Sequence, residues 1–239
     1  MQRKNTIKLL YLTELLVNIK RTMTSIKAHI KSLRTEFTSG MLDEKSVSKS
    51  PVSQFQKWLK QSVDANTLEP NAMTLATSTK NGIVDARIVL LRDFGIKGLS
   101  FFTNYKSIKG REIRLNKNVC LNFFWPELQR QVRIKGVIEK LPARSSDLYF
   151  AGRPRESQIA AWASHQSETL IDRAELEKRY EKYSQSFEGK KVPRPPHWGG
   201  YRVIPDYFEF WQGRRSRLHD RIIYSSSRSK GWTIQRLNP

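Results

Sequence analysis

Short apolar runs separated by turn residues recur through the middle of this sequence, and they limit the possible fold more than any other feature. Five such runs fall between Met73 and Val137, each with the length and β-branched or aromatic content of a strand. Asn81-Gly82 stands between the first two and favours a tight hairpin turn in which both residues take positive φ. Short strands joined by turns predict an antiparallel barrel or sandwich. The runs cover residues 73–77, 86–91, 99–103, 119–125 and 131–137.

Helix signals flank and interrupt these runs. Ser50-Pro51 is typical of a helix start, with serine as N-cap and proline in the first turn. Ser107 is expected to cap a short helix, and Asp172 with Glu175 forms a capping-box pattern. The apolar stripe that follows, at positions 176, 180, 183 and 187, is expected to be core or interface. Further helical segments are predicted over 107–115, 142–150 and 157–163, and further strands over 201–211, 221–224 and 232–237.

The charge balance points to anionic partners. The 239 residues carry 43 Lys and Arg against 22 Asp and Glu, a net charge of +21, while 38% hydrophobic residues suffice for a core. The basic excess is spread along the chain and no nucleic-acid recognition motif is present, so nucleic acid is not an expected partner. A membrane is not expected either, since no apolar stretch approaches the ~20 residues of a membrane-spanning helix. The single cysteine, Cys120, excludes an internal disulfide and is expected in the core.

The N-terminus has a composition of its own. Residues 1–34 carry eight Lys and Arg and one acid, Glu14, and their leucines could line one side of a basic helix. This resembles a mitochondrial transit peptide; a disordered tail, or translation that begins at Met23, are the alternatives. Residues 1–48 are therefore treated as a basic extension, partly disordered or targeting, and residues 49–239 as the functional domain.

The most concentrated chemistry lies in residues 211–221. Four arginines, one histidine, one aspartate and one tryptophan fall within these eleven residues. Strand-like runs over 207–210 and 221–224 flank them, so the cations are expected on a β scaffold. Such a cluster suits an anion held by directed hydrogen bonds, and a solvated basic loop is the alternative.

Common cofactor and metal motifs are missing. There is no GxGxxG, P-loop or CxxC, and the four histidines lack metal-ligand spacing, so no metal site is predicted. A phosphorylated cofactor must therefore be held by side-chain cations. Arg87 and Arg92 bracket a strand and face opposite sides unless a bulge intervenes or one lies at the strand's end. Lys109 opens a predicted helix, where an anion is favoured.

Together these segments resemble the pyridoxamine/pyridoxine 5′-phosphate oxidase family, whose members use FMN. The resemblance runs from about Ile30 to the C-terminus with almost no gaps. Its most specific part is Glu-Phe-Trp-Gln-Gly at 209–213 followed by Arg-Leu-His-Asp-Arg at 217–221. The other matching stretches are residues 87–91, 101–104, 130–132, 153–159, 165–167 and 198–200.

The resemblance implies an α+β fold that is mainly β. This is an antiparallel, Greek-key-like split β-barrel with peripheral helices, assembled as a homodimer with FMN at the subunit interface. The implied reaction, in vitamin B6 metabolism, is oxidation of pyridoxamine 5′-phosphate and/or pyridoxine 5′-phosphate by dioxygen. A hydride equivalent passes to flavin N5, and the products are pyridoxal 5′-phosphate and hydrogen peroxide. A cytoplasmic location is expected, with a mitochondrial one as the alternative.

Residue roles are carried over by position from this resemblance. Arg217 and His219 are the implied catalytic residues, which position the substrate and steer charge. Arg214 and Arg215 have no matched role and are expected to be solvated. The implied cofactor-binding residues are Arg87, Ile88, Val89, Leu90, Leu91, Arg92, Phe102, Thr103, Lys109, Gln131, Gln166, Ser167, Trp211 and Arg221. The implied substrate-binding residues are Arg34, Arg92, Tyr149, Arg153, Ser157, Arg217, Leu218 and His219.

Three positions depart from the family's usual pattern. Arg92 stands where lysine is usual, Ile108 where arginine is usual, and Phe37 where tyrosine is frequent. Losing one charged hydrogen bond at position 108 predicts FMN binding weaker by roughly 1.5–3 kcal/mol, about ten- to a hundredfold. These departures keep an alternative open, a divergent, weakly active or non-catalytic relative that binds FMN or pyridoxal 5′-phosphate.

Overall fold

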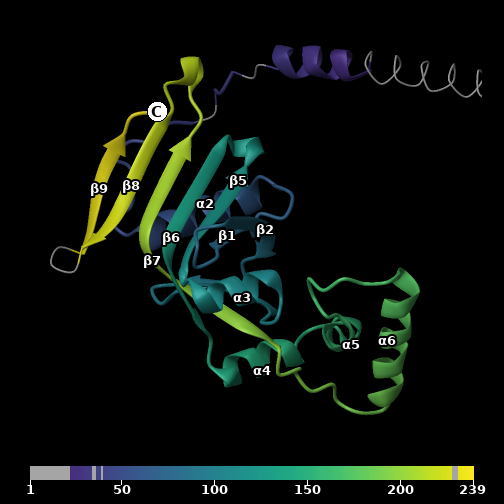
Figure 1. Ribbon diagram of the computed structural model, residues 1–239. Coiled ribbons are helices and arrows are strands. Elements are labelled where there is room, and N and C mark those ends of the chain that lie inside the picture. Colours follow the sequence, from purple (N-terminus) through teal and green to yellow (C-terminus); the bar gives the residue numbers. More distant parts are fainter. Residues whose placement is uncertain (1–21, 34–35, 39, 228–230) are drawn as a thin grey trace, which may run out of the picture. The chain divides into compact units, whose positions relative to one another are not determined.

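The computed structural model describes residues 22–33, 36–38, 40–227 and 231–239 (Figure 1). The chain divides into two units, residues 1–37 and residues 38–239. In the first unit residues 22–32 are helical, and the side chains of residues 22–33 are exposed. The targeting prediction rests largely on residues 1–21, and Arg34 is a predicted substrate residue; both lie outside the described residues. No described helix is long and apolar enough to cross a membrane.

The described part of the second unit is built on one antiparallel sheet, as the turn-separated runs predicted. Its path runs β2-β1-β5-β6-β7-β4-β3, and β8 pairs with both β7 and β9. The alternation of buried and half-buried residues along β1 and β5 shows which face meets the core. The strands are β1 Ala72–Ser78, β2 Val84–Leu90, β3 Asp93–Gly95, β4 Gly98–Asn104, β5 Asn118–Trp125, β6 Arg130–Lys140, β7 Trp198–Gln212, β8 Asp220–Ser227 and β9 Gly231–Leu237.

Helices begin where the sequence predicts caps. The Ser50 hydroxyl accepts from the Ser53 N–H, and the Asp172 carboxylate accepts from the Glu175 N–H. Ser107 caps the helix that carries Lys109. The helices are α2 Pro51–Asp64, α3 Ile108–Leu115, α4 Ala143–Ala151, α5 Arg155–Ala163 and α6 Arg173–Ser186, and short 3₁₀ turns cover Pro126–Leu128 and Arg215–Arg217.

The main core lies between α2 and the sheet. Phe55 of α2 packs 5.0 Å from Phe123, and Trp58 meets Phe210 edge-on at 5.2 Å, measured between ring centroids. A second, smaller cluster joins α4, α5 and α6 around Trp198 at the start of β7. Tyr180, Tyr183 and Phe187 of the predicted stripe pack into it, which confirms their structural role.

Two local expectations needed correction. The hairpin between β1 and β2 exists, but Thr79 N–H bonds to the Ile83 carbonyl at 2.9 Å and leaves a three-residue loop. Gly82 alone of the predicted Asn81-Gly82 pair has positive φ, 82°, as expected for a type I turn closed by a left-handed glycine. The strand β3 was not predicted, because three residues are too few to show alternation.

Candidate active site

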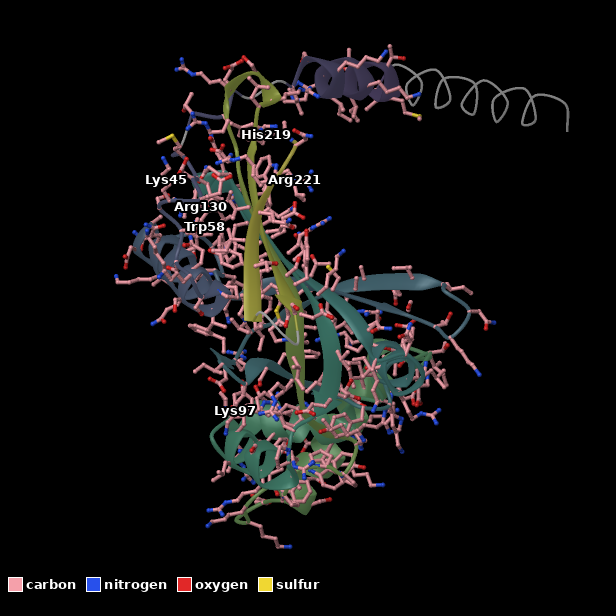
Figure 2. The ribbon with its side chains drawn as sticks, turned by 90° about the vertical axis from the view of Figure 1, so that its left-hand side faces the viewer. Lys45, Trp58, Lys97, Arg130, His219 and Arg221 are labelled. Carbon is pink, nitrogen blue, oxygen red and sulfur yellow. The ribbon has the colours of Figure 1, made fainter. Side chains whose placement is uncertain are left out.

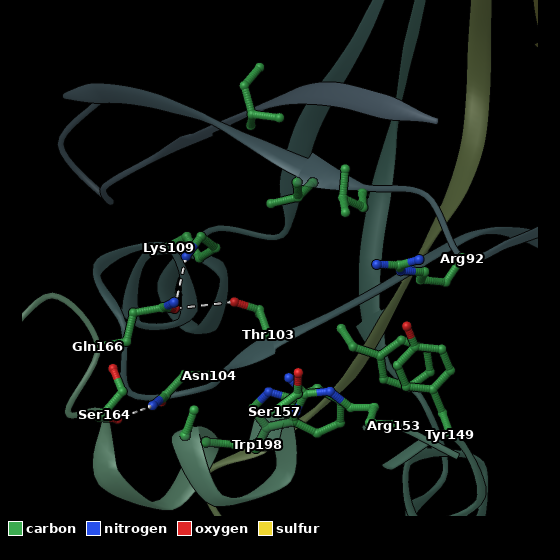
Figure 3. A pocket seen from close by; sticks show the side chains of 16 residues that line it. Arg92, Thr103, Asn104, Lys109, Tyr149, Arg153, Ser157, Ser164, Gln166 and Trp198 are labelled. Atoms are coloured by element: carbon green, nitrogen blue, oxygen red, sulfur yellow. Dashed lines mark hydrogen bonds between the residues drawn. The ribbon is translucent and has the colours of Figure 1, made fainter. Parts of the chain in front are cut away.

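A cavity of about 370 Å³ opens between β2, β4 and the helices α3, α4 and α5. Its walls are apolar along the end of β2 and aromatic along β4 and β7, and cations stand at its two ends (Figure 3). Eleven of its sixteen lining residues were predicted to bind cofactor or substrate. The lining is Ile88, Val89, Leu90, Arg92, Phe102, Thr103, Asn104, Lys109, Tyr149, Arg153, Ser157, Ala160, Ala161, Ser164, Gln166 and Trp198.

Lys109 marks one end of the cavity. It lies in the first turn of α3, is only 8% exposed, and its Nζ donates to Gln166 Oε1 at 3.1 Å. The hydroxyl of Thr103 lies 3.4 Å from the same oxygen. Burial lowers the pKa of Lys109, and the nearby charge of Arg87 lowers it further. A lysine, a hydroxyl and a helix N-terminus together suit a phosphate group.

Arg92 and Arg153 mark the other end, next to Tyr149 (Figure 3). The guanidinium of Arg153 stacks 4.6 Å from the ring centroid of Trp198, and its Nη1 is buried without a hydrogen-bond partner in the described structure. Burial lowers the pKa of Arg153, and the charge of Arg92 adds to this effect. Arg92 lies two residues beyond Leu90, the last residue of β2, so it need not face the side opposite Arg87 as it would within a regular strand. A buried, unpaired guanidinium nitrogen is a strong donor for an anion.

Arg87, Leu91 and Ser167 do not line the cavity. The guanidinium of Arg87 instead forms ion pairs with Asp85 at 2.5 Å and with Glu112 at 3.2 Å. Leu91 is buried in the core, and Ser167 takes a left-handed backbone conformation with φ 71° beside a neighbouring pocket.

The remaining predicted residues gather around the β7–β8 hairpin. Trp211 faces Gln131 on β6 and Arg221 on β8. The ring of His219 lies 4.6 Å from Trp211, and burial, followed by the charge of Arg217, lowers its pKa. This lowered pKa keeps the imidazole of His219 neutral at pH 7. Leu218 is 70% exposed at the hairpin tip.

The hairpin tip is backbone-strained. Ser216 and Arg217 have φ of 55° and 60°, values that non-glycine residues rarely adopt. Arg214, expected to be solvated, instead bonds to the Gly40 carbonyl at 2.7 Å and lies 3.6 Å from the Asp220 carboxylate. Arg215 is exposed as expected.

A buried carboxylate supports this hairpin, and sequence reasoning missed it. Glu209 is 2% exposed and binds Arg221 at 2.8 Å and Arg133 at 2.6 Å, while Tyr207 donates to it at 2.9 Å. Burial raises the pKa of Glu209, but the bonds from Arg221 and Tyr207 and the charge of Arg133 outweigh burial and leave it below its ordinary value. Along β7, Glu209 stands between the core residues Phe208 and Phe210 and so lies on the other face of the sheet, where only the strand register shows its partners.

The two groups of predicted residues lie at opposite ends of β7. Trp198 begins this strand in the cavity and Trp211 lies thirteen residues later, which at about 3.3 Å per residue is roughly 40 Å along the strand. Figure 1 shows β7 running from α4 to the hairpin, and Figure 2 shows His219 and Arg221 close together toward one end of the sheet. One chain therefore does not bring Lys109 and His219 together.

Comparisons with known proteins agree on one family. The family described as "Pyridoxamine 5′-phosphate oxidase" matches residues 59–187, and "Pyridoxine 5′-phosphate oxidase C-terminal dimerisation region" matches residues 198–239. The pyridoxine/pyridoxamine 5′-phosphate oxidase of Paraburkholderia phymatum is 51% identical over 210 residues, 88% of this chain and 99% of the relative. This chain belongs to the pyridoxine/pyridoxamine 5′-phosphate oxidase family. The relative of that name from Trichormus variabilis is 49% identical, with 88% and 98% covered.

Two solved structures share the fold. PhzG from Burkholderia lata 383, in complex with tetrahydrophenazine-1-carboxylic acid, superposes with a TM-score of 0.79 at 30% identity, over 84% of this chain and 99% of PhzG. A pyridoxamine 5′-phosphate oxidase-related, FMN binding protein from Nostoc punctiforme gives 0.63 at 15% identity, over 81% of this chain and all of that protein, and shows the fold alone. The predicted split β-barrel is thereby confirmed.

Family membership also bears on assembly and location. The match to the dimerisation region over 198–239 supports a homodimer and includes both β7 and β8. The relatives named above are bacterial, and nothing in them supports the mitochondrial prediction.

Five lining residues of the cavity were not predicted as site residues. Asn104 and Trp198 stood inside matched stretches, which was a usable signal. The amide of Asn104 donates to the Ser164 carbonyl at 3.4 Å and ties β4 to the end of α5. Ala160, Ala161 and Ser164 carried no signal, because the sequence does not show whether a small residue in or just after a helix lines a cavity.

Proposed function

We propose that this chain is an FMN-dependent oxidase that converts pyridoxamine 5′-phosphate and/or pyridoxine 5′-phosphate to pyridoxal 5′-phosphate, with dioxygen as acceptor and hydrogen peroxide as product. The observation that carries the proposal is the cavity with cations at both ends, because two phosphates, one of the cofactor and one of the substrate, need two such ends. The relatives' printed names support the same reaction.

The Lys109 end fits the phosphate of FMN. Lys109 and Thr103 would hold it, and Gln166, bonded to Lys109, fixes the lysine head group. The apolar side chains of residues 88–90 line the same cavity and suit a flat ring system. FMN, when bound, would supply the acceptor for the hydride equivalent.

The Arg153 end fits the phosphate of the substrate. Arg153 offers its unpaired Nη1, and Arg92 adds a second charge. The hydroxyls of Tyr149 and Ser157 lie in the same lining. These groups would bind and orient the substrate, so that its reacting carbon stays in one place.

The hairpin residues would complete the site from a second copy of the chain. Trp211 and Arg221 would contact the flavin, and Arg217 and His219 the substrate ring. Glu209 holds Arg221 in place through a buried ion pair. Nδ1 of His219 accepts from the backbone N–H of Arg214 at 3.1 Å, so a neutral His219 carries its proton on Nε2 and can donate a hydrogen bond to the substrate. Arg217 can stabilise negative charge near the ring.

Flavin content and peroxide release test this proposal. The purified full chain, reconstituted with excess FMN, should absorb near ~450 nm and release peroxide with pyridoxamine or pyridoxine 5′-phosphate. Pyridoxamine without its phosphate is the control, and should react poorly. Folded, FMN-loaded protein that turns over tetrahydrophenazine-1-carboxylic acid and neither phosphate ester would overturn the proposal.

A weakly catalytic binder of FMN or pyridoxal 5′-phosphate is the second candidate. Ile108 favours it, because this residue opens α3 next to Lys109 and is 41% exposed without any charge. The double variant R92K/I108R separates the two. Full turnover by the native chain excludes the second candidate, whereas turnover that appears only in the double variant supports it.

A further inference from the structure

The two cationic ends of the cavity differ in their counter-charges. Among the described residues, no aspartate or glutamate lines the cavity, and none forms an ion pair with Arg92 or Arg153. A dianion at that end therefore meets two uncompensated positive charges.

At the other end, the positive charges are already compensated. Arg87 stands behind Lys109, close enough for its charge to act on the lysine. Arg87 is ion-paired with Asp85 at 2.5 Å and with Glu112 at 3.2 Å. Two cations and two carboxylates cancel, and the apolar side chain of Ile108 adds no charge. A dianion here meets a site with no net attraction from formal charges.

Glu112 is the buried member of this group. It lies three residues after Lys109 on the same face of α3, and it is 7% exposed, whereas the Asp85 side chain is 47% exposed. Its Oε2 accepts from both the Thr77 hydroxyl and Arg87. The charges of both carboxylates act on Lys109, and that of Glu112 is the less exposed to screening by water.

We propose that Glu112 sets the affinity for the cofactor's phosphate, which it lowers by offsetting the charges of Arg87 and Lys109. The inference rests on the proposed function, in which FMN occupies the Lys109 end. It predicts an oxidase that holds its substrate's phosphate firmly and its cofactor's phosphate loosely, so that FMN exchanges with the free pool.

Substitution E112Q tests this directly. Glutamine keeps an oxygen that accepts from Thr77 and Arg87 and removes only the charge. Dissociation constants for FMN and for riboflavin, measured on the full chain by quenching of flavin fluorescence, separate phosphate from ring contributions. E112Q should bind FMN on the order of tenfold more tightly, with a steeper salt dependence. The affinity for riboflavin should not change, whereas a loss of cavity structure would weaken the binding of both FMN and riboflavin.

E139Q is the matched control. Glu139 is also paired with an arginine, Arg202, at 2.6 Å, and lines no part of this cavity. It should leave both dissociation constants within about twofold of the native values. D85N removes the other carboxylate that acts on Lys109, should also tighten FMN binding, and provides the test if E112Q does not fold.

Failure of this inference is distinguishable from failure of the proposed function. Native protein that binds neither FMN nor riboflavin overturns both. Native protein that binds FMN, together with a folded E112Q that binds it equally or more weakly, overturns the inference alone. In that outcome Glu112 serves only to support Arg87.

Discussion

Arg153 combines three features at the scale of one residue. It stacks on Trp198, its Nη1 is buried without a partner in the described structure, and the charge of Arg92 lies nearby. An unpaired buried guanidinium is costly to the free protein, and an incoming anion relieves that cost. Burial and electrostatics therefore both favour a bound phosphate here.

Removing this guanidinium should weaken substrate binding more than it slows turnover. R153A should raise KM for pyridoxamine 5′-phosphate by about ten- to a hundredfold, the cost of one or two charged hydrogen bonds, with kcat little changed. Steady-state peroxide assays measure both constants. R144A, at an exposed arginine of α4, is the control and should behave as native. An unchanged KM in R153A would remove this residue from the substrate site.

At the scale of an element, the β1–β2 hairpin depends on one left-handed residue. Gly82 has φ 82°, and a Cβ added there meets no atom within 4 Å. Gly95 in β3 has equally free space around a Cβ but no positive φ, so it serves as the control. G82A should therefore cost about 1–2 kcal/mol of unfolding free energy through backbone strain alone. G95A tests the space without the strain and should cost clearly less. Equal losses in denaturant unfolding would refute this account of the loop.

The β7–β8 hairpin depends on the carboxylate of Glu209. Because its pKa is lower in the folded chain than in the unfolded one, its contribution to stability is present above the unfolded value and is lost as pH falls through the folded value. E209Q should cost about 2–4 kcal/mol at neutral pH and less in acid, since both arginines lose a buried partner. Unfolding at pH 7 and pH 4 measures the difference. Y207F, which removes one hydrogen bond, should cost about 1 kcal/mol; a cost of E209Q that does not change with pH would contradict the assignment.

Elements were largely predictable because their signals are local. The caps at Ser50, Ser107 and Asp172 and the alternation along the strands depend only on neighbours in sequence. The strand β3 was too short to detect. The hairpin loop was misjudged because its length depends on which backbone hydrogen bond closes it, here the one from Thr79 to Ile83. Ion pairs between distant segments, such as that of Glu112 in α3 with Arg87 in β2, depend on how the helix packs on the sheet and leave no sequence pattern.

At the scale of the whole molecule, the predicted site residues divide between the two ends of β7. The resemblance supplied their identities, but neither composition nor spacing indicated that Arg153 and His219 lie far apart in one chain. A homodimer, supported by the match over 198–239, can bring the cavity of one copy to the hairpin of another.

Complementation between two impaired variants, assayed at substrate concentrations far below the KM of R153A, tests this shared site. R153A damages the cavity half and H219A the hairpin half. After unfolding and refolding together, half of the dimers are mixed, and each holds one undamaged site, so about a quarter of native activity should return. Each variant refolded alone is the control. Failure of the mixture to exceed the two separate variants would place all these residues in a site within one chain.

The length of β7 has a consequence for how the protein behaves in solution. Its fifteen residues carry Trp198 at one end and Trp211 near the other, so under the proposed function each copy holds two halves of different sites and no whole one. With a site shared in this way, association is required for every catalytic event, and the dissociated chain is inactive however well it is folded. Specific activity should then fall when the protein is diluted below the dissociation constant of its own dimer.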